Sequence, residues 1–301
     1  MIYLDLTGNL GNQMFIYACG RKLQETTKQP ITLNTYNLDH KHPDYTFSLN
    51  IFVLNENVTV ERKKKIPFYA SHESLFYKIV SKIPFCSRFI KKTYYKIMSR
   101  FNIFVWDDIS YIPINIANKD KDIYLSGFWQ SPLYFDDIRN LILNDFVLKE
   151  SNRSHISEFL NKIRNVNSVC VSIRRGDYLS NPIYKAKHYI CTPTYFENCV
   201  EMIKRDLSSP ILFLFSDDVD WVRQNINYDI ETLYEETGYS LSQKILLMSA
   251  CKNFILSNSS FSWWVEYLSS NDAKFVIAPS RWYSNNSNKD VYQPYWHIIN
   301  I

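Results

Sequence analysis

The chain has 301 residues, of which 46% are hydrophobic and 21% charged, and its net charge is +4. This composition is typical of a globular protein with one large domain or two of ordinary size. The small net charge gives no argument for a nucleic-acid partner, and no apolar run approaches the ~20 residues of a membrane-spanning helix. The six cysteines form no CxxC pair and no metal-like spacing, so we expect reduced, buried thiols in a cytoplasmic protein. The first residues form a strand pattern, so we expect no signal peptide.

The first half of the chain begins with a strand, a glycine loop and a helix. The strand is expected at residues 2–6 and the helix at 14–24, and Gly8 and Gly11 lie between them. This order resembles the first unit of a dinucleotide-binding fold, in which the loop approaches a ligand. The alternative is a tight turn that Asn12 caps. Further strands are expected at 30–34, 103–106 and from Asp122, an extended segment at 45–54, and a helix at 138–143.

A basic segment at residues 61–100 interrupts this pattern. It contains the run Arg62-Lys63-Lys64-Lys65 and an apolar periodicity that predicts two amphipathic helices separated by Pro84. Basic amphipathic helices can lie on an anionic membrane surface. The alternative is a solvated basic face over an apolar stripe that faces the core.

The second half alternates between strands and helices. Periodicity is lost near residues 150–153, where we place a domain boundary. Strands are expected at 168–173, 211–215, 231–234 and 253–257, and a strand at 274–279 closes the sheet. Helices are expected at 156–164, 194–205 and 240–251, and a long loop at 180–191. This alternation predicts a doubly wound domain with a parallel sheet.

Two arginines follow the first strand of this half. The strand is apolar on both faces and runs into Arg174, Arg175, Gly176 and Asp177. Ligands of parallel sheets bind at the carboxyl ends of the strands, where two guanidinium groups suit a diphosphate. Asp177 can orient one of the guanidinium groups. The alternative is a structural Arg–Asp ion pair at the strand end.

Polar residues follow two other strands of the same sheet. Asn258-Ser259-Ser260 opens a helix, on whose N–H groups a diphosphate can lie, although serine also serves as an ordinary N-cap. Asp217 and Asp218 can accept hydrogen bonds from a ribose or a guanine. Asp218-Val219-Asp220 also has the DxD pattern of metal-dependent glycosyltransferases, but Asp220 opens a predicted helix, which argues against a metal.

Several blocks in order resemble glycosyltransferase family 11, the α-1,2-fucosyltransferases. The blocks are Gly8-Asn9-Leu10-Gly11-Asn12-Gln13-Met14-Phe15, Ile173-Arg174-Arg175-Gly176-Asp177-Tyr178, Phe215-Ser216-Asp217-Asp218, Leu247-Met248-Ser249-Ala250-Cys251-Lys252, Ser257-Asn258-Ser259-Ser260-Phe261-Ser262-Trp263-Trp264 and Pro279-Ser280-Arg281-Trp282-Tyr283. The Arg-Arg-x-Asp core is shared with α-1,6- and protein O-fucosyltransferases. Three positions depart from the family pattern: Ser172 replaces a common histidine, Asn9 a glycine, and Ser242-Gln243-Lys244 lacks an expected acid. These departures bear on acceptor preference.

The resemblance implies an α/β, GT-B-like fold with two Rossmann-like, doubly wound domains facing across a cleft. Residues 1–150 would be the acceptor-side domain, with 61–100 as a basic helical insertion. Residues 151–301 would bind the GDP-sugar. The implied reaction is an inverting, metal-independent transfer of L-fucose from GDP-β-L-fucose to the 2-hydroxyl of a β-galactoside. The acceptor would be an oligosaccharide or lipid-linked glycan, as in synthesis of O antigen or capsule.

The resemblance also assigns roles to residues. Arg174 and Arg175 would bind GDP, with Arg174 catalytic, and Asp217 would read the ribose or base. Ser259, Ser260 and Phe261 would complete the diphosphate cradle. Gly11 and Asn12 would approach the fucose or acceptor, and Asp177 is a candidate base.

No cofactor or metal is expected besides the donor substrate. The protein is expected in the bacterial cytoplasm, at the inner face of the membrane if residues 61–100 bind lipid. Two alternatives stay open. One is a different linkage, acceptor or sugar nucleotide on the same fold. The other is a non-catalytic glycan-binding component of a polysaccharide-synthesis complex.

Overall fold

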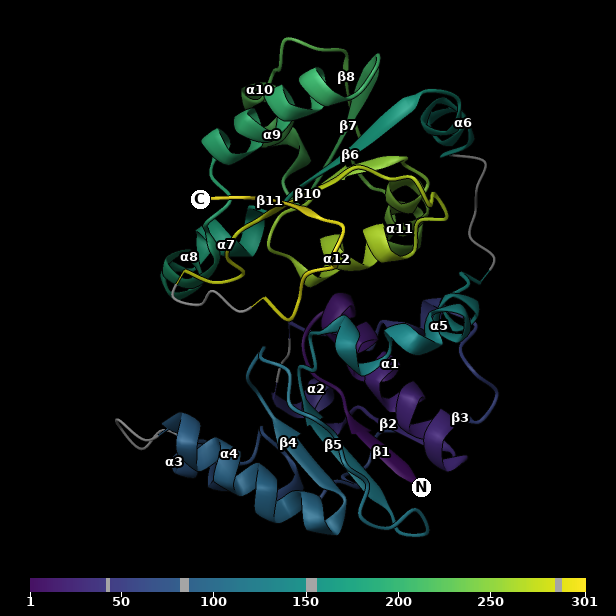
Figure 1. The fold of residues 1–301 in the computed structure, drawn as a ribbon, viewed down its shortest axis with the longest axis vertical. Helices are drawn as coiled ribbons and strands as arrows, with labels where there is room; N and C mark the ends of the chain where they lie inside the picture. Colours follow the sequence, from purple (N-terminus) through teal and green to yellow (C-terminus); the bar gives the residue numbers. More distant parts are fainter. Residues whose placement is uncertain (42–43, 82–86, 150–155, 285–288) are drawn as a thin grey trace. The chain divides into compact units, whose positions relative to one another are not determined.

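The computed structural model describes residues 1–41, 44–81, 87–149, 156–284 and 289–301, apart from the side chains of Val80, Ser87 and Asp177. Contacts divide the chain into two compact units, Met1–Lys149 and Glu150–Ile301. Each unit has its own parallel sheet with helices packed against it (Figure 1). The boundary expected at 150–153 lies outside the described residues. The α/β class predicted from the alternating pattern is confirmed.

Unit 1 contains a five-stranded parallel sheet in the order β3-β2-β1-β5-β4. Its strands are β1 (Ile2–Asp5), β2 (Ile31–Asn34), β3 (Val58–Glu61), β4 (Ile103–Trp106) and β5 (Ile123–Gly127). Strand β3 was not predicted, because this edge strand has no buried residue and therefore no clear hydrophobic signal.

The helices of unit 1 include one long helix, α1, after the first strand. They are α1 (Leu10–Thr27), α2 (Tyr36–Lys41), α3 (Leu75–Ser81), α4 (Ser87–Met98) and α5 (Arg139–Asp145), with short 3₁₀ turns η1 (Leu49–Ile51), η2 (Phe68–Ala70), η3 (Ser99–Phe101), η4 (Pro132–Tyr134) and η5 (Asp136–Ile138). The two helices predicted in the basic segment are confirmed as α3 and α4, although Pro84 lies outside the described residues.

Three expectations for unit 1 are wrong in detail. Helix α1 begins at Leu10 rather than at residue 14, so Gly11 and Asn12 lie in its first turn. The N-cap is Asn9, not Asn12, and its side chain makes no capping hydrogen bond. The segment expected to be extended contains η1, because local hydrogen bonds such as Phe52 N–H to the Leu49 carbonyl fold it back.

Glycine is needed at two turns of unit 1. Gly8, before α1, has a φ of +70°, and a Cβ there would lie 2.2 Å from Asn12 Nδ2. Gly127, at the end of β5, has a φ of +131°, and its Cβ would lie 1.8 Å from the Trp106 carbonyl oxygen. Both the left-handed backbone and the close contacts exclude a side chain.

Unit 2 contains a six-stranded parallel sheet in the order β11-β10-β9-β6-β7-β8. Its strands are β6 (Asn167–Ile173), β7 (Pro210–Ser216), β8 (Thr232–Tyr234), β9 (Asn253–Ile255), β10 (Val276–Pro279) and β11 (His297–Ile299). The prediction that the strand at 274–279 closes the sheet is wrong, because β11 pairs with β10 outside it. This edge strand is short and largely exposed, so its sequence has no strand signature.

The helices of unit 2 alternate with the strands. They are α6 (Ser157–Asn165), α7 (Gly176–Ser180), α8 (Pro182–His188), α9 (Pro193–Asp206), α10 (Val219–Asn225), α11 (Leu241–Ser249) and α12 (Ser260–Tyr267). The loop predicted at 180–191 is wrong, because α8 occupies most of it. The Asn181 side chain accepts hydrogen bonds from the N–H groups of Ile183 and Tyr184, and Pro182 takes the first helical position. No residue of α8 is buried, so apolar periodicity could not reveal the helix.

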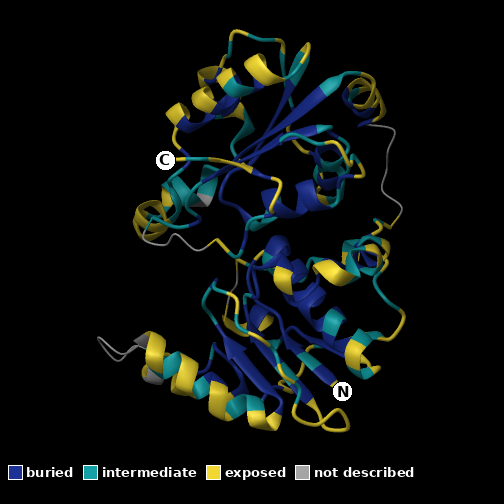
Figure 2. Ribbon diagram, viewed as in Figure 1, coloured by how far each residue is buried: buried dark blue, intermediate teal, exposed yellow. Residues whose placement is uncertain are grey.

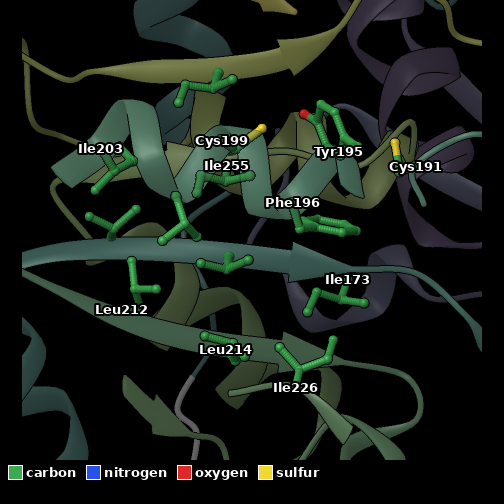
Figure 3. Close-up of a cluster of buried hydrophobic side chains, with 14 of the residues drawn as sticks. Ile173, Cys191, Tyr195, Phe196, Cys199, Ile203, Leu212, Leu214, Ile226 and Ile255 are labelled. Atoms are coloured by element: carbon green, nitrogen blue, oxygen red, sulfur yellow. The ribbon is translucent and has the colours of Figure 1, made fainter. Parts of the chain in front are cut away.

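The core of unit 2 fixes the position of β6. Alternate residues of β6, including Ile173, pack against α9 together with side chains of the neighbouring strands (Figure 3). Strand β6 is buried on both faces (Figure 2). Each such apolar side chain contributes about 1.5–3 kcal/mol when buried. The residues that follow Ile173 are therefore attached to a strand that is held rigidly in the core.

The described part of the chain has no helix with the length and apolar character needed to cross a membrane. The five cysteines in this part are free and buried.

Candidate active site

The carboxyl edge of the unit 2 sheet brings together most of the predicted site residues. Arg174 and Arg175 follow β6, and Asp217 and Asp218 follow the neighbouring strand β7. On the other side of β6, the segment after β9 leads to Ser259, Ser260 and Phe261 at the start of α12. Gly11 and Asn12 lie in unit 1. The unit 2 sheet alone thus assembles the part of the site assigned to the nucleotide.

Arg174 is held by an acid and an aromatic ring. Its Nη1 lies 3.0 Å from Asp217 Oδ2, and both side chains are between a fifth and a third exposed. Its guanidinium carbon lies 5.6 Å from the centre of the Tyr178 ring, within the range of a cation–π interaction. Arg174 is therefore oriented at the edge of the sheet while still reaching solvent.

The side chain of Arg175 is more buried than that of Arg174. Its backbone N–H donates to Asp217 Oδ1 at 2.8 Å, and its Nε lies 3.5 Å from Asp218 Oδ2. Its guanidinium carbon lies 3.1 Å from the centre of the Trp221 ring, and the side chain is only 13% exposed. Because Trp221 covers one face of the guanidinium plane, Arg175 is confined to a narrow range of orientations.

Asp217 and Asp218 contact the two arginines, whereas the sequence suggests that Asp177 can orient one of the guanidinium groups. The side chain of Asp177 lies outside the described residues, although its backbone belongs to α7, and its roles as an orienting group and a candidate base stay predictions. Gly176 allows α7 to approach Asp217, since a Cβ at Gly176 would lie 2.8 Å from Asp217 Oδ2.

Asn258 connects the loops around the start of α12. Its side-chain nitrogen donates to the backbone oxygens of His188 and Trp282, at 2.9 and 3.0 Å. Its own backbone oxygen accepts a hydrogen bond from the Tyr178 hydroxyl at 3.2 Å. Tyr178 therefore contacts both Arg174 and the segment that leads into α12.

The N-terminus of α12 has the expected serine cap. Ser259 Oγ accepts a hydrogen bond from the Phe261 N–H at 3.3 Å. Ser259 is buried, whereas Ser260 and Phe261 are partly exposed. The geometry by itself shows N-capping, and the start of a helix also favours a negative charge.

The DxD segment has other partners in the structure. Asp218 pairs with Arg175 and precedes α10 as its N-cap, and Asp220 lies in the first turn of that helix. Among the residues that the structure describes, no three histidine, cysteine, aspartate or glutamate side chains are grouped as a metal site would require.

Comparison with known proteins now identifies the family. The model of the family described as "Glycosyl transferase family 11" matches residues 1–300. The chain belongs to glycosyltransferase family 11. It is 28% identical to the "O-antigen biosynthesis glycosyltransferase WbnK" of Escherichia coli, over 98% of this chain and 99% of that protein. It is 30% identical to an "Alpha-1,2-colitosyltransferase" of Escherichia coli, over 94% of this chain and 92% of that protein.

Solved fucosyltransferase structures share the fold of this family 11 enzyme. The crystal structure of the fucosyltransferase NodZ from Bradyrhizobium matches with a TM-score of 0.52 and 11% identity, covering 89% of this chain and 91% of that chain. At this identity the likeness concerns the fold alone. It supports the expected GT-B class, a fold built from two Rossmann-like units.

In this family 11 enzyme, Ser172 is a buried structural residue. Its Oγ lies 2.6 Å from Ser262 Oγ, which in turn lies 3.0 Å from Ser257 Oγ. The three hydroxyl groups join the end of β6 to the first turn of α12. Ser172, one of the three departures from the family pattern, thus supports the carboxyl edge of the sheet next to Arg174.

The third departure contains Lys244, which forms an ion pair with a fully buried carboxylate, and this pair was not predicted. Lys244 Nζ lies 3.0 Å from Glu235 Oε1 and donates to the Ser216 carbonyl oxygen at 2.9 Å. Glu235 also accepts a hydrogen bond from the Ser216 N–H at 2.7 Å. Burial raises the pKa of the fully buried Glu235 carboxyl, and the Lys244 ammonium opposes this change. The pair fixes the end of β7 immediately before Asp217, and the unexpected lysine was its only signal in the sequence.

Unit 1 of the enzyme places Asn12 beside Gln130. Asn12 Oδ1 accepts a hydrogen bond from Gln130 Nε2 at 2.6 Å, and Gln130 Oε1 is buried without a hydrogen-bond partner among the described residues. The next residue, Gln13, has a structural role, because it donates to the backbone oxygens of Gly8 and Thr46. Gly11 is buried in the first turn of α1. Asn12 is therefore the more accessible of the two predicted unit 1 residues.

A buried carboxylate network in unit 1 was not predicted either. Asp5 is fully buried at the end of β1 and accepts hydrogen bonds from Asn37, Ser71 and Ser126, at 2.6–2.7 Å. His72 Nδ1 lies 2.7 Å from Ser126 Oγ. A single aspartate at a strand end carries no strong sequence signal, and its partners come from distant segments.

A small pocket lies beside this network at the carboxyl end of β2. It has a volume of about 150 Å³ and is lined by amide, hydroxyl, lysine and apolar side chains: Asn34, Tyr36, Asn37, Lys41, Lys64, Ile66, Phe68, Ser71, Ser74 and Leu75. Amides and hydroxyls beside an aromatic ring are suited to binding a polar ligand such as a sugar.

Proposed function

We propose that this family 11 enzyme transfers L-fucose from GDP-β-L-fucose to the 2-hydroxyl of a β-galactoside, during synthesis of a bacterial surface polysaccharide. The observation that carries the proposal is the pair Arg174 and Arg175, held at the carboxyl edge of β6 by Asp217 and Asp218. The relatives named as an O-antigen glycosyltransferase and an α-1,2-colitosyltransferase support the reaction class and the linkage.

The donor would lie on the nucleotide edge of unit 2. A guanidinium group has five N–H donors, so Arg174 can keep its contact with Asp217 and still donate to a phosphate oxygen. The capped start of α12, at Ser259, Ser260 and Phe261, would receive the other side of the diphosphate. Asp217 would accept a hydrogen bond from the ribose or the base. Solved NodZ structures soaked with GDP-fucose or crystallised with GDP share this fold.

The chemistry would be a displacement with inversion. The acceptor hydroxyl would attack the anomeric carbon of β-L-fucose from the face opposite GDP and form an α-fucoside. As the bond to GDP breaks, the sugar acquires oxocarbenium character and negative charge grows on the diphosphate. Arg174 and Arg175 would stabilise that charge, and the loss of one such donor typically reduces the rate about 10²–10³-fold. In this proposal Asp177 is the candidate base and no metal ion is required.

Unit 1 would bind the acceptor. Asn12 is partly exposed at the start of α1, and the pocket at the end of β2 presents amide and hydroxyl groups. Hydrogen-bonding groups of this kind recognise the hydroxyl groups of a sugar. The acceptor would be an oligosaccharide or a lipid-linked glycan.

A second donor, GDP-colitose, is favoured by one observation. The α-1,2-colitosyltransferase of Escherichia coli is 30% identical over 94% of this chain. Colitose is fucose without the 3-hydroxyl. A site that hydrogen-bonds this hydroxyl would reject colitose by about 10⁴–10⁵-fold, whereas a site with an apolar surface there would discriminate only about 10²-fold. The ratio of kcat/KM for the two donors therefore separates the candidates.

The test uses the purified protein with either GDP-sugar and a β-galactoside, and NMR to determine the linkage of the product. We expect an α-1,2 product, with activity that persists in EDTA. Arg174→Ala should reduce kcat/KM about 10²–10³-fold. Arg205→Ala is the matched control, because this exposed arginine of the same unit pairs with the adjacent Asp206.

Three outcomes would contradict the proposal. The first is a product with another linkage, and the second is an Arg174→Ala variant that is as active as wild type. The third is a protein that binds oligosaccharide but transfers neither sugar, which would instead indicate a non-catalytic component of a polysaccharide-synthesis complex.

A further inference from the structure

The segment that contains α3 and α4 has an unusual charge distribution. Residues 74–106 include seven lysines and arginines and no acidic residue, in a chain that has 30 acidic residues among 301. The net charge of the whole chain is only +4. Positive charge is therefore concentrated on this part of unit 1.

Helix α4 and the turn η3 present four of these charges in one row. Arg88, Lys92, Lys96 and Arg100 recur every four residues, the spacing that places side chains on one helix face. All four are exposed, and none lies within ion-pair distance of a carboxylate in the described part of the chain. Lys91 differs, because it pairs with Asp107 at 2.8 Å.

An apolar row lies next to the basic row. Phe89, Ile97 and Phe101 lie on positions spaced by multiples of four residues, with the exposed Thr93 between Phe89 and Ile97, and are 73%, 51% and 67% exposed. On α3, Leu75 and Ile79 are 75% and 62% exposed. Isolated exposed apolar residues are common on proteins, but a group on two adjacent helices marks an interaction surface.

Aromatic contacts connect the two helices on the apolar side. The Phe76 ring lies 5.9 Å from the Phe68 ring and 6.2 Å from the Tyr94 ring, between ring centres. Tyr94 is three residues from Ile97, so α3 adjoins the apolar side of α4 rather than the basic row. On the inner side of the helices, Tyr77 of α3 and Tyr95 of α4 are already buried. The outer apolar residues are therefore not needed for the core of unit 1.

We propose that the outer face of α3 and α4 docks on the surface of an anionic lipid bilayer. Phe89, Ile97 and Phe101 would enter the headgroup region, and the adjacent basic row would contact lipid phosphates. A protein partner suits this face less well, because it would have to desolvate four cations and supply an acid for each. A bilayer leaves these cations at the level of its negatively charged headgroups.

The experiment measures flotation of the full-length protein with vesicles, without donor or acceptor, so its result does not depend on the proposed transfer reaction. Vesicles of phosphatidylglycerol and phosphatidylcholine in equal parts are compared with vesicles of phosphatidylcholine alone. We expect binding to the anionic vesicles that weakens with salt, and little binding to the neutral ones. Each cation near an anionic surface strengthens binding about fivefold.

Two double variants separate the contributions of charge and apolar contact. Lys92→Glu with Lys96→Glu should weaken vesicle binding at least about 25-fold, since two favourable charges are lost. Phe89→Ser with Ile97→Ser should weaken it at low and high salt alike. The matched control is Lys119→Glu with Lys121→Glu, which reverses two exposed charges elsewhere in unit 1. Circular dichroism verifies that each variant is folded.

Three results would overturn the proposal. The first is that wild-type protein does not float with anionic vesicles at low salt. The second is that the lysine control variant loses as much vesicle binding as the Lys92/Lys96 variant, and the third is that both double variants of α4 bind vesicles as well as wild type. A fourth contradicting result could come from light scattering, which measures self-association. If wild-type protein self-associates without binding vesicles, and the Phe89→Ser, Ile97→Ser variant does not self-associate, the face would instead bind a second copy of the chain.

Discussion

At the scale of single residues, the site depends on pairs that are distant in the sequence. Arg175 is 42 residues from Asp217, yet its N–H donates to that carboxylate. The reason is the register of the two strands, since β6 and β7 pair in parallel up to Ile173 and Ser216. The residues immediately after these two, Arg174 and Asp217, therefore lie side by side. A motif search identifies the arginines, but only the register identifies their partners.

Trp221 provides a prediction at this scale. Trp221→Leu removes the ring that lies against the Arg175 guanidinium group. A cation–π contact of this kind contributes about 0.5–2 kcal/mol, so we expect the affinity for GDP to fall about 2–30-fold. Isothermal titration with GDP measures the change. Trp221→Phe, the matched control, keeps an aromatic face and should lose less. Equal affinity for GDP in both variants and wild type would show that the stacking does not position Arg175 for the nucleotide.

At the scale of elements, the turn that follows β5 brings the end of this strand close to β4 and leads to a partner of α1. Strand β5 ends at Gly127, where the backbone passes against the Trp106 carbonyl oxygen of β4. The turn then leads to Gln130, the partner of Asn12 at the start of α1. A change at Gly127 would thus disturb both the sheet and the predicted acceptor side.

Gly127→Ala and Gly238→Ala form a matched pair that separates steric overlap from backbone strain. Both glycines have positive φ, +131° and +91°, but only at Gly127 would the new Cβ meet other atoms, whereas at Gly238 nothing lies within 4 Å. We expect Gly238→Ala to cost about 1 kcal/mol from strain alone, and Gly127→Ala about 3–5 kcal/mol. Urea denaturation measures both free energies of unfolding. Similar values for the two variants would contradict the overlap argument.

At the scale of the whole molecule, the chain consists of two units with separate sheets and cores. The arginines, their acids and the α12 N-terminus all belong to unit 2. The Asp5 network, Asn12 and the basic face of α3 and α4 belong to unit 1. In the proposed function, the nucleotide and the acceptor would therefore bind to different units.

Hydrogen exchange measured with and without GDP tests the division. At a concentration 100 times the Kd, a ligand stabilises the state it binds by about 2.7 kcal/mol. We expect slower amide exchange at residues 174–178, 217–221 and 258–261, where unit 2 would hold the nucleotide. Amides of residues 1–149 should change less. Protection confined to unit 1 would contradict the assignment of GDP to unit 2.

The sequence by itself determined the α/β class, most strands and helices, the family and the pair of arginines, because hydrophobic period, turn residues and motifs are local properties of the chain. It did not reveal β3, β11 or α8, because elements at an edge or on the surface bury little and leave a weak pattern. Only the tertiary structure decided which acids hold Arg174 and Arg175, that Ser172 supports α12, and that Lys244 pairs with Glu235. These contacts depend on the parallel register of strands far apart in the sequence, which arises when the sheet packs as a whole.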